Sequence, residues 1–209
     1  MKTKINNWNR EAKKEARYET IVKPYKQIFN LESLPENKSY WSLCGNCVKN
    51  GEIYPGSEPA QLIEDKFLQA NQFNGVENNK TIFNNLSKCK QVNFYHGNIF
   101  SILTTQRNDP NFNPGIINLD FLKTAKSEMN NFKIVLDLFK NYHHLMIVAN
   151  FCLSHHGIKI KPESIIEEIN SINSELINKY EPYTIDGKPI IYKYVSNKFD
   201  MGSVIFYRR

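Results

Sequence analysis

Short apolar runs alternate with helical patterns along most of the chain. The predicted strands, which are apolar and short, span residues 39–44, 73–77, 92–96, 115–119, 145–151, 190–195 and 203–207. The predicted helices, which repeat apolar positions at helical spacing, span residues 8–30, 57–68, 80–86, 124–141 and 162–180. Strands that alternate with helices in this way predict an α/β fold, in which a mostly parallel sheet carries helices on both faces.

The two ends of the chain depart from this alternation. Residues 1–38 predict a basic helical N-terminal extension, divided at Pro24, and residues 39–209 predict a three-layer domain. The last two predicted strands are joined only by residues 196–202, which contain Gly202. Because this link is too short for a crossover helix, we expect the last pair of strands to form an antiparallel hairpin.

Polar residues and glycines follow the first four predicted strands. They are Cys44, Gly45, Asn46 and later Ser57 after the first strand, Glu77 at the end of the second, Gly97 and Asn98 after the third, and Asn118 and Asp120 at the end of the fourth. Ligands of open parallel sheets bind beyond the carboxyl ends of the strands, so we expect these residues to surround one ligand. A nucleoside suits them, because Glu77 can hold two ribose hydroxyls and Asn98 can bond an adenine edge. Asp120 lies where a reacting group would be presented.

This order of motifs resembles the class I S-adenosylmethionine-dependent methyltransferases over residues 39–209. That family has an acidic residue at the end of its second strand, a Gly-Asp or similar pair after its third, a polar motif after its fourth, and a closing antiparallel hairpin. The matching segments here are Gly75-Val76-Glu77, Gly97-Asn98, Asn118-Leu119-Asp120-Phe121 and residues 190–207. The resemblance implies a Rossmann-like fold, an S-adenosylmethionine cofactor and direct methyl transfer to an acceptor near Asp120.

The resemblance also implies roles for individual residues. It implies cofactor contacts from Cys44, Gly45, Asn46, Ser57, Glu77, Asn98 and Asp120, and catalytic roles for Asp120 and Asn118. The family's glycine-rich turn after the first strand is reduced here to Gly45, and no Pro-Pro-aromatic sequence follows Asn118. The resemblance therefore does not imply that this protein shares the substrates of the enzymes that methylate the exocyclic amines of nucleic acid bases. A base is optional for in-line methyl transfer, so the role of Asp120 as a base stays open.

The basic charge of the chain lies at its ends. The 27 basic and 21 acidic residues give a net charge of +6, and the first 30 residues hold eight basic and three acidic side chains. Basic ends favour phosphate contacts, so nucleic acid is the slightly preferred acceptor. An exposed helix with interleaved charges explains the same pattern. The alternative function is an inactive methyltransferase-like module that binds nucleic acid or a protein through its basic termini.

Several classes of protein are disfavoured by the sequence. No apolar run approaches the ~20 residues that span a bilayer, and the N-terminus has no apolar signal core, so we expect a cytoplasmic protein without membrane contact. Four cysteines are too few for a disulfide scaffold in 209 residues. Cys44 and Cys47 form a Cys-x-x-Cys pair, but no second pair follows, so zinc and redox functions are disfavoured and no metal is expected. An NAD-linked enzyme is disfavoured by the predicted hairpin.

Overall fold

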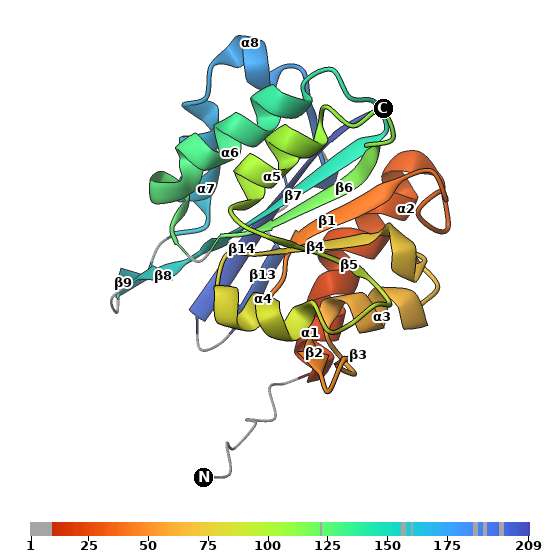
Figure 1. The fold of residues 1–209 in the computed structure, drawn as a ribbon. Coiled ribbons are helices and arrows are strands. Elements are labelled where there is room, and N and C mark those ends of the chain that lie inside the picture. The colour runs from red at the N-terminus through yellow and green to blue at the C-terminus, as the bar shows by residue number, and fades with distance from the viewer. Residues whose placement is uncertain are drawn as a thin grey trace.

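The computed structural model describes residues 10–121, 123–155, 158–159, 161–185, 188–189, 192–196 and 199–209. A twisted sheet runs through the middle of the protein and helices cover both of its faces (Figure 1). The strands of this sheet are β1 (Ser39–Leu43), β4 (Phe73–Glu77), β5 (Asn93–His96), β6 (Pro114–Asp120), β7 (Leu145–Cys152), β10 (Glu181–Pro182), β13 (Tyr192–Ser196) and β14 (Phe199–Arg208). The expected α/β fold is confirmed.

The order of the strands in the sheet differs from their order in the chain. Neighbouring strands follow the order β10-β14-β7-β6-β1-β4-β5, and β13 pairs with the outer side of β14. The five strands from β7 to β5 are mutually parallel. The last strand, β14, runs antiparallel to both β7 and β13, so it is inserted between them. The predicted antiparallel hairpin is confirmed, although residues 190–191 of the predicted strand lie outside the described residues.

Helices are present on each face of the sheet. They are α1 (Arg10–Arg17), the π-helical turn η1 (Tyr18–Val22), α2 (Lys23–Phe29), α3 (Glu58–Glu64), the 3-10 turn η2 (Ala70–Gln72), α4 (Lys80–Leu86), α5 (Ile99–Gln106), α6 (Ala125–Phe139), α7 (Glu163–Asn170) and α8 (Ser174–Ile177). Alternate residues of β6 point to opposite faces. Ile117 and Leu119 pack in the core under α5, α6 and α7, whereas Ile116 packs in the core under α2, α3 and α4.

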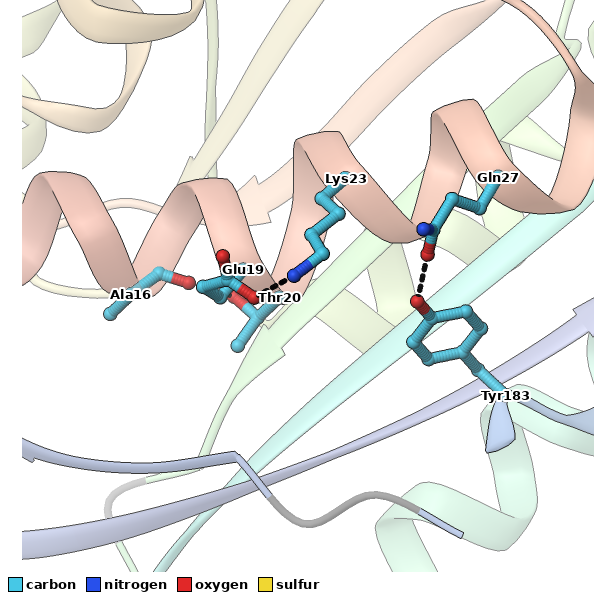
Figure 2. A network of polar contacts seen from close by, with 6 residues as sticks. All are labelled: Ala16, Glu19, Thr20, Lys23, Gln27 and Tyr183. Carbon is cyan, nitrogen blue, oxygen red and sulfur yellow. Dashed lines mark hydrogen bonds and ion pairs between the residues drawn. The ribbon is translucent and has the colours of Figure 1, made fainter. Parts of the chain in front are cut away.

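The N-terminal helical segment packs directly on the sheet. Its α1, η1 and α2 parts follow one another without a break, and Pro24 lies in the first turn of α2. Ile21 and Tyr25 are buried in the same core as residues of β1 and β6. Figure 2 shows the polar contacts along this segment: Thr20 Oγ1 donates to the backbone oxygen of Ala16 at 2.7 Å, and Tyr183, which follows β10, donates to Gln27. The predicted division into an N-terminal extension over residues 1–38 and a domain over residues 39–209 stays a prediction.

Some elements differ from the pattern-based expectations. The predicted helix over 57–68 ends at Glu64, and Lys66 takes a left-handed conformation (φ 54°) that turns the chain. The predicted helix over 162–180 is divided into α7 and α8. The sequence did not predict α5, since only Ile99 and Leu103 of that helix are buried. Short hairpins also lie in segments expected to be loops: β2 (Val48–Lys49) with β3 (Glu52–Ile53), β8 (Ser154–His155) with β9 (Ile158–Lys159), and β11 (Thr184–Ile185) with β12 (Lys188–Pro189).

Candidate active site

The structure brings the predicted strand ends to one edge of the sheet. Because β6, β1, β4 and β5 are parallel neighbours, their carboxyl ends lie side by side. Ser42 near the end of β1 pairs with Asn118 on one side and with Gly75 on the other. Glu77 is the last residue of β4 and pairs with His96 of β5. The edge therefore has the geometry expected for a ligand site of an open sheet.

Four of the residues predicted to hold a cofactor lie after β1: Cys44, Gly45, Asn46 and Ser57. Gly45 is exposed, and a Cβ added there would meet no atom within 4 Å. Ser57 occupies the N-cap position of α3, and its side chain makes no capping hydrogen bond. Its Oγ is instead a buried oxygen without a hydrogen-bond partner among the described residues. Such an oxygen is available to a polar ligand atom.

Three further predicted residues make hydrogen bonds within the fold. Glu77 Oε1 accepts the backbone N–H of Asn79 at 2.7 Å, which fixes this carboxylate at the end of β4. Asn98 caps α5 by accepting the N–H of Phe100 at 2.9 Å. Asn46 is exposed, and its Oδ1 accepts from the Asn85 amide at 2.8 Å. Their contacts with a ligand remain predictions.

The Cys44–Cys47 pair has the properties of packed thiols. Both cysteines are free and buried. The pKa of Cys44 is raised far above its ordinary value, first by the hydrogen bond with Cys47 and then by burial. A Cβ on Gly75 would lie 2.5 Å from Cys44 Sγ, so the thiol fills the space that this glycine leaves. Within the described part of the chain no three histidine, cysteine or acidic residues gather as a metal site.

A hollow of about 70 Å³, partly open to solvent, lies between α1, η1 and the carboxyl ends of β6 and β7. It is lined by Lys13, Ala16, Arg17, Thr20, Ile21, Glu58, Asn118, Asp120 and Asn150. The hollow therefore joins the predicted catalytic pair, Asn118 and Asp120, to residues of the N-terminal helix.

Five side chains form a buried polar network beneath the hollow. Ser203 on β14 donates to Asn150 Oδ1 at 2.5 Å, and Asn150 Nδ2 donates to Asn118 Oδ1 at 2.9 Å. Asn118 Nδ2 then donates to Glu58 Oε1 at 3.3 Å, and the Tyr40 hydroxyl donates to the same oxygen at 2.5 Å. Each donor meets an acceptor, so the network fixes the Glu58 carboxylate at the wall of the hollow.

Charges face one another across the hollow. Asp120 is half-buried, and its pKa is raised from 3.8 to about 6, first by burial and then by the negative charge of Glu58. Lys13 and Arg17 oppose this shift. The pKa of Lys13 is lowered by burial and by Arg17, while Asp120 and Glu58 act in the opposite direction. A half-buried carboxylate with a pKa near neutrality is suited to accept a proton.

The sequence analysis missed Lys13, Arg17, Glu58, Asn150 and Ser203. A signal existed for Asn150, because it interrupts an otherwise apolar strand, and buried amides need partners. Glu58 was predicted to lie in the first turn of a helix, where acidic residues are common. No local signal connects the N-terminal helix with β6, since this contact joins distant parts of the chain.

Several basic side chains of the N-terminal helix bind other residues of the protein. Arg17 Nη1 donates to the Gly56 oxygen at 3.1 Å and to Gln61 at 3.0 Å. Lys23 and Lys26 form ion pairs of 2.7 Å each with acidic side chains of the same region, Glu19 and Glu32 respectively. These contacts account for part of the basic character of the N-terminus. None of the described helices is long and apolar enough to cross a bilayer.

Comparisons with known proteins agree with this fold. No protein-family model and no curated protein matches the sequence. Among solved structures, the magnesium protoporphyrin IX methyltransferase (ChlM) of Synechocystis PCC 6803 with bound SAM matches with a TM-score of 0.52 and 7% identity, over 95% of this chain and 81% of that chain. The same enzyme with bound SAH matches with a TM-score of 0.50 and 6% identity, over 95% and 84%.

The strand order, the inserted antiparallel β14 and these matches define the class of fold. The protein has the Rossmann-like fold of the class I S-adenosylmethionine-dependent methyltransferases, as the resemblance implied. One structure of this fold was solved with S-adenosylmethionine bound, which is the cofactor that the motifs predicted.

Proposed function

We propose that the protein is an S-adenosylmethionine-dependent methyltransferase that transfers a methyl group directly to an acceptor in the hollow beside Asp120. The main support is the sheet, in which parallel strands ending in Glu77, Gly97-Asn98 and Asn118-Leu119-Asp120 are closed by an antiparallel last strand. This arrangement supports the proposal because it brings the Glu77 carboxylate and the polar groups of the β6 end to one edge of the sheet.

The residues of the β1 and β4 ends fit the proposed cofactor. Gly45 leaves open space beside the backbone, Ser57 Oγ has no internal partner among the described residues, and Glu77 is fixed at the position of a ribose-binding acid. The proposed cofactor contacts are Cys44, Gly45, Asn46, Ser57, Glu77, Asn98 and Asp120. When bound, S-adenosylmethionine would supply a methyl group on a sulfonium sulfur, which keeps the electron pair of the broken carbon–sulfur bond.

The chain's own groups position the acceptor and limit its contact with water. Helix α1 and the turn η1 cover the hollow, which partly excludes solvent. Asn118 and Asp120 project from the same face of β6, because they are two residues apart. We propose that Asp120 accepts a proton from the acceptor, for which its raised pKa of about 6 is suited.

The structure gives little support to nucleic acid as the methyl acceptor, which the basic charge of the termini had suggested. Nucleic acid was slightly preferred because both ends of the chain are basic. Several of these basic groups contact the fold itself, among them Arg17, Lys23 and Lys26. The alternative of an inactive module that binds through basic termini is therefore not favoured.

Isothermal titration calorimetry with S-adenosylmethionine and S-adenosylhomocysteine tests the proposed function. We expect both to bind the wild-type chain and to raise its melting temperature. Glu77→Ala should weaken binding at least tenfold, whereas Glu52→Ala, an exposed carboxylate on β3, should not. Gly45→Ala should leave the fold intact and weaken binding, since its Cβ would enter the open space. No heat of binding together with an unchanged melting temperature would refute the proposal.

A further inference from the structure

The hollow contains two carboxylates that come from different elements. Glu58 is in the first turn of α3, and Asp120 ends β6. Each lies within range of the other's charge, because Glu58 is the second cause of the raised pKa of Asp120. Two partly buried negative charges favour a cation between them. Lys13 and Arg17 supply the positive charges that offset this repulsion in the present structure.

The chain already places an alkylammonium in this hollow. Lys13 reaches in from α1 and interacts with both Asp120 and Glu58, although burial and Arg17 lower its pKa. Arg17 has a different role, since its Nη1 donates to the Gly56 oxygen and to Gln61 on the wall. The Lys13 side chain therefore shows which chemical group the two carboxylates accept.

Because the polar network engages the Asn118 amide, the carboxylates of Glu58 and Asp120 are the groups of this wall that can bind a ligand. Both ends of the Asn118 amide are engaged internally, because its Oδ1 accepts from Asn150 and its Nδ2 donates to Glu58. On Glu58, both donors of the network bind Oε1. This arrangement holds the Glu58 carboxylate in one orientation.

We propose that the hollow binds an aliphatic amine as the methyl acceptor, held as its ammonium between Glu58 and Asp120 where Lys13 now reaches. The inference rests on the proposed methyltransferase function. The ammonium loses one proton to the Asp120 carboxylate, and the nitrogen lone pair then forms the bond to the methyl carbon. The carbon–sulfur bond breaks, and its electron pair stays on the sulfur of S-adenosylhomocysteine. Charge, rather than a base-edge hydrogen-bond pattern, selects this acceptor.

The test compares three probes of similar shape and different charge. n-Butylammonium, n-butanol and n-butyrate are titrated into the full chain, with and without S-adenosylhomocysteine, and binding is followed by the carboxyl NMR resonance of Asp120. We expect n-butylammonium to bind at least tenfold more tightly than the other two and to lower the pKa of Asp120. Equal or tighter binding of n-butyrate overturns the inference. This measurement needs no variant.

Substitutions of Glu58 and Lys13 test whether n-butylammonium binds in the hollow. Glu58→Gln keeps an acceptor oxygen for Tyr40 and should weaken n-butylammonium binding at least tenfold, whereas Glu64→Gln, exposed on the same helix, should leave it unchanged. Lys13→Met removes the internal competitor and should tighten binding. Unchanged or weaker binding in Lys13→Met overturns the inference, as does unchanged binding in Glu58→Gln.

Titration of S-adenosylhomocysteine separates this proposal from the proposed function. If S-adenosylhomocysteine binds and n-butylammonium does not, only the amine proposal fails. If n-butylammonium binds and S-adenosylhomocysteine does not, the methyltransferase proposal fails. Loss of S-adenosylhomocysteine affinity in Glu58→Gln with n-butylammonium binding retained assigns Glu58 to the cofactor and overturns the amine site.

Discussion

Replacing Asp120 with asparagine should stabilise the protein at neutral and alkaline pH. The pKa of Asp120 rises from 3.8 to about 6 on folding, chiefly because burial disfavours the charged form. The protonated carboxyl therefore favours the fold fully below about pH 4, and this contribution is lost as the pH rises through about 6. Asparagine has nearly the same shape and does not ionise.

The size of the effect follows from the shift in pKa. The rise of the pKa from 3.8 to about 6 corresponds to about 3 kcal/mol of stability that is lost at high pH. This value already includes the attraction of Asp120 to Lys13 and Arg17, and it is an upper limit because solvent screens a half-buried charge. The free energy of unfolding of Asp120→Asn, measured by urea titration, should equal that of the wild type near pH 4 and exceed it by as much as about 3 kcal/mol near pH 8.

The fluorescence of buried Trp41 offers a direct signal for these unfolding curves. In a Glu58→Gln background the gain from Asp120→Asn should be smaller, because one cause of the raised pKa is absent. A loss of stability in Asp120→Asn at pH 8, or a gain that does not depend on pH, would refute the reasoning.

Three further substitutions test the packing around the site. Asn150→Leu should cost about 1–3 kcal/mol in urea unfolding, since it leaves the buried Ser203 hydroxyl without its acceptor; adding Ser203→Ala should recover part of this loss. Gly75→Ala should cost about 1–3 kcal/mol in the same assay, because its Cβ would lie 2.5 Å from Cys44 Sγ, and an unchanged stability would show that the thiol moves freely. Arg17→Ala should speed hydrogen exchange in the N-terminal helix without abolishing folding, because the guanidinium links this helix to α3; unchanged exchange would contradict that role.

Much of the sheet could be predicted from local pattern. The apolar run over 145–151 matches β7, and the run over 115–119 matches β6, because strands buried on both faces are apolar throughout. Placement of Glu77 and Asp120 at one edge followed from the parallel arrangement alone. Helix α5 could not be predicted in this way, because it has only 8 residues and buries only Ile99 and Leu103.

The hollow beside Asp120 depends on contacts between distant parts of the chain. Arg17 and Gln61 are 44 residues apart, and Asn118 and Glu58 are 60 apart. Neither pair has a local pattern that specifies its meeting, because the contacts form only after the helix and the sheet pack together. The one sequence feature that indicated a buried polar contact was Asn150, an amide within the apolar run of β7.

The predicted responses of Asp120 and Asn150 have opposite signs although both side chains line the same hollow. Asn150 is a buried amide whose oxygen and nitrogen are both bonded, so its removal leaves partners without hydrogen bonds. Asp120 carries a charge that burial opposes, so its removal relieves a cost. A sequence selected only for stability would keep Asn150 and lose Asp120. A destabilising carboxylate beside a satisfied network supports the proposed role of Asp120, because the network supplies rigidity and the carboxylate is suited to accept a proton.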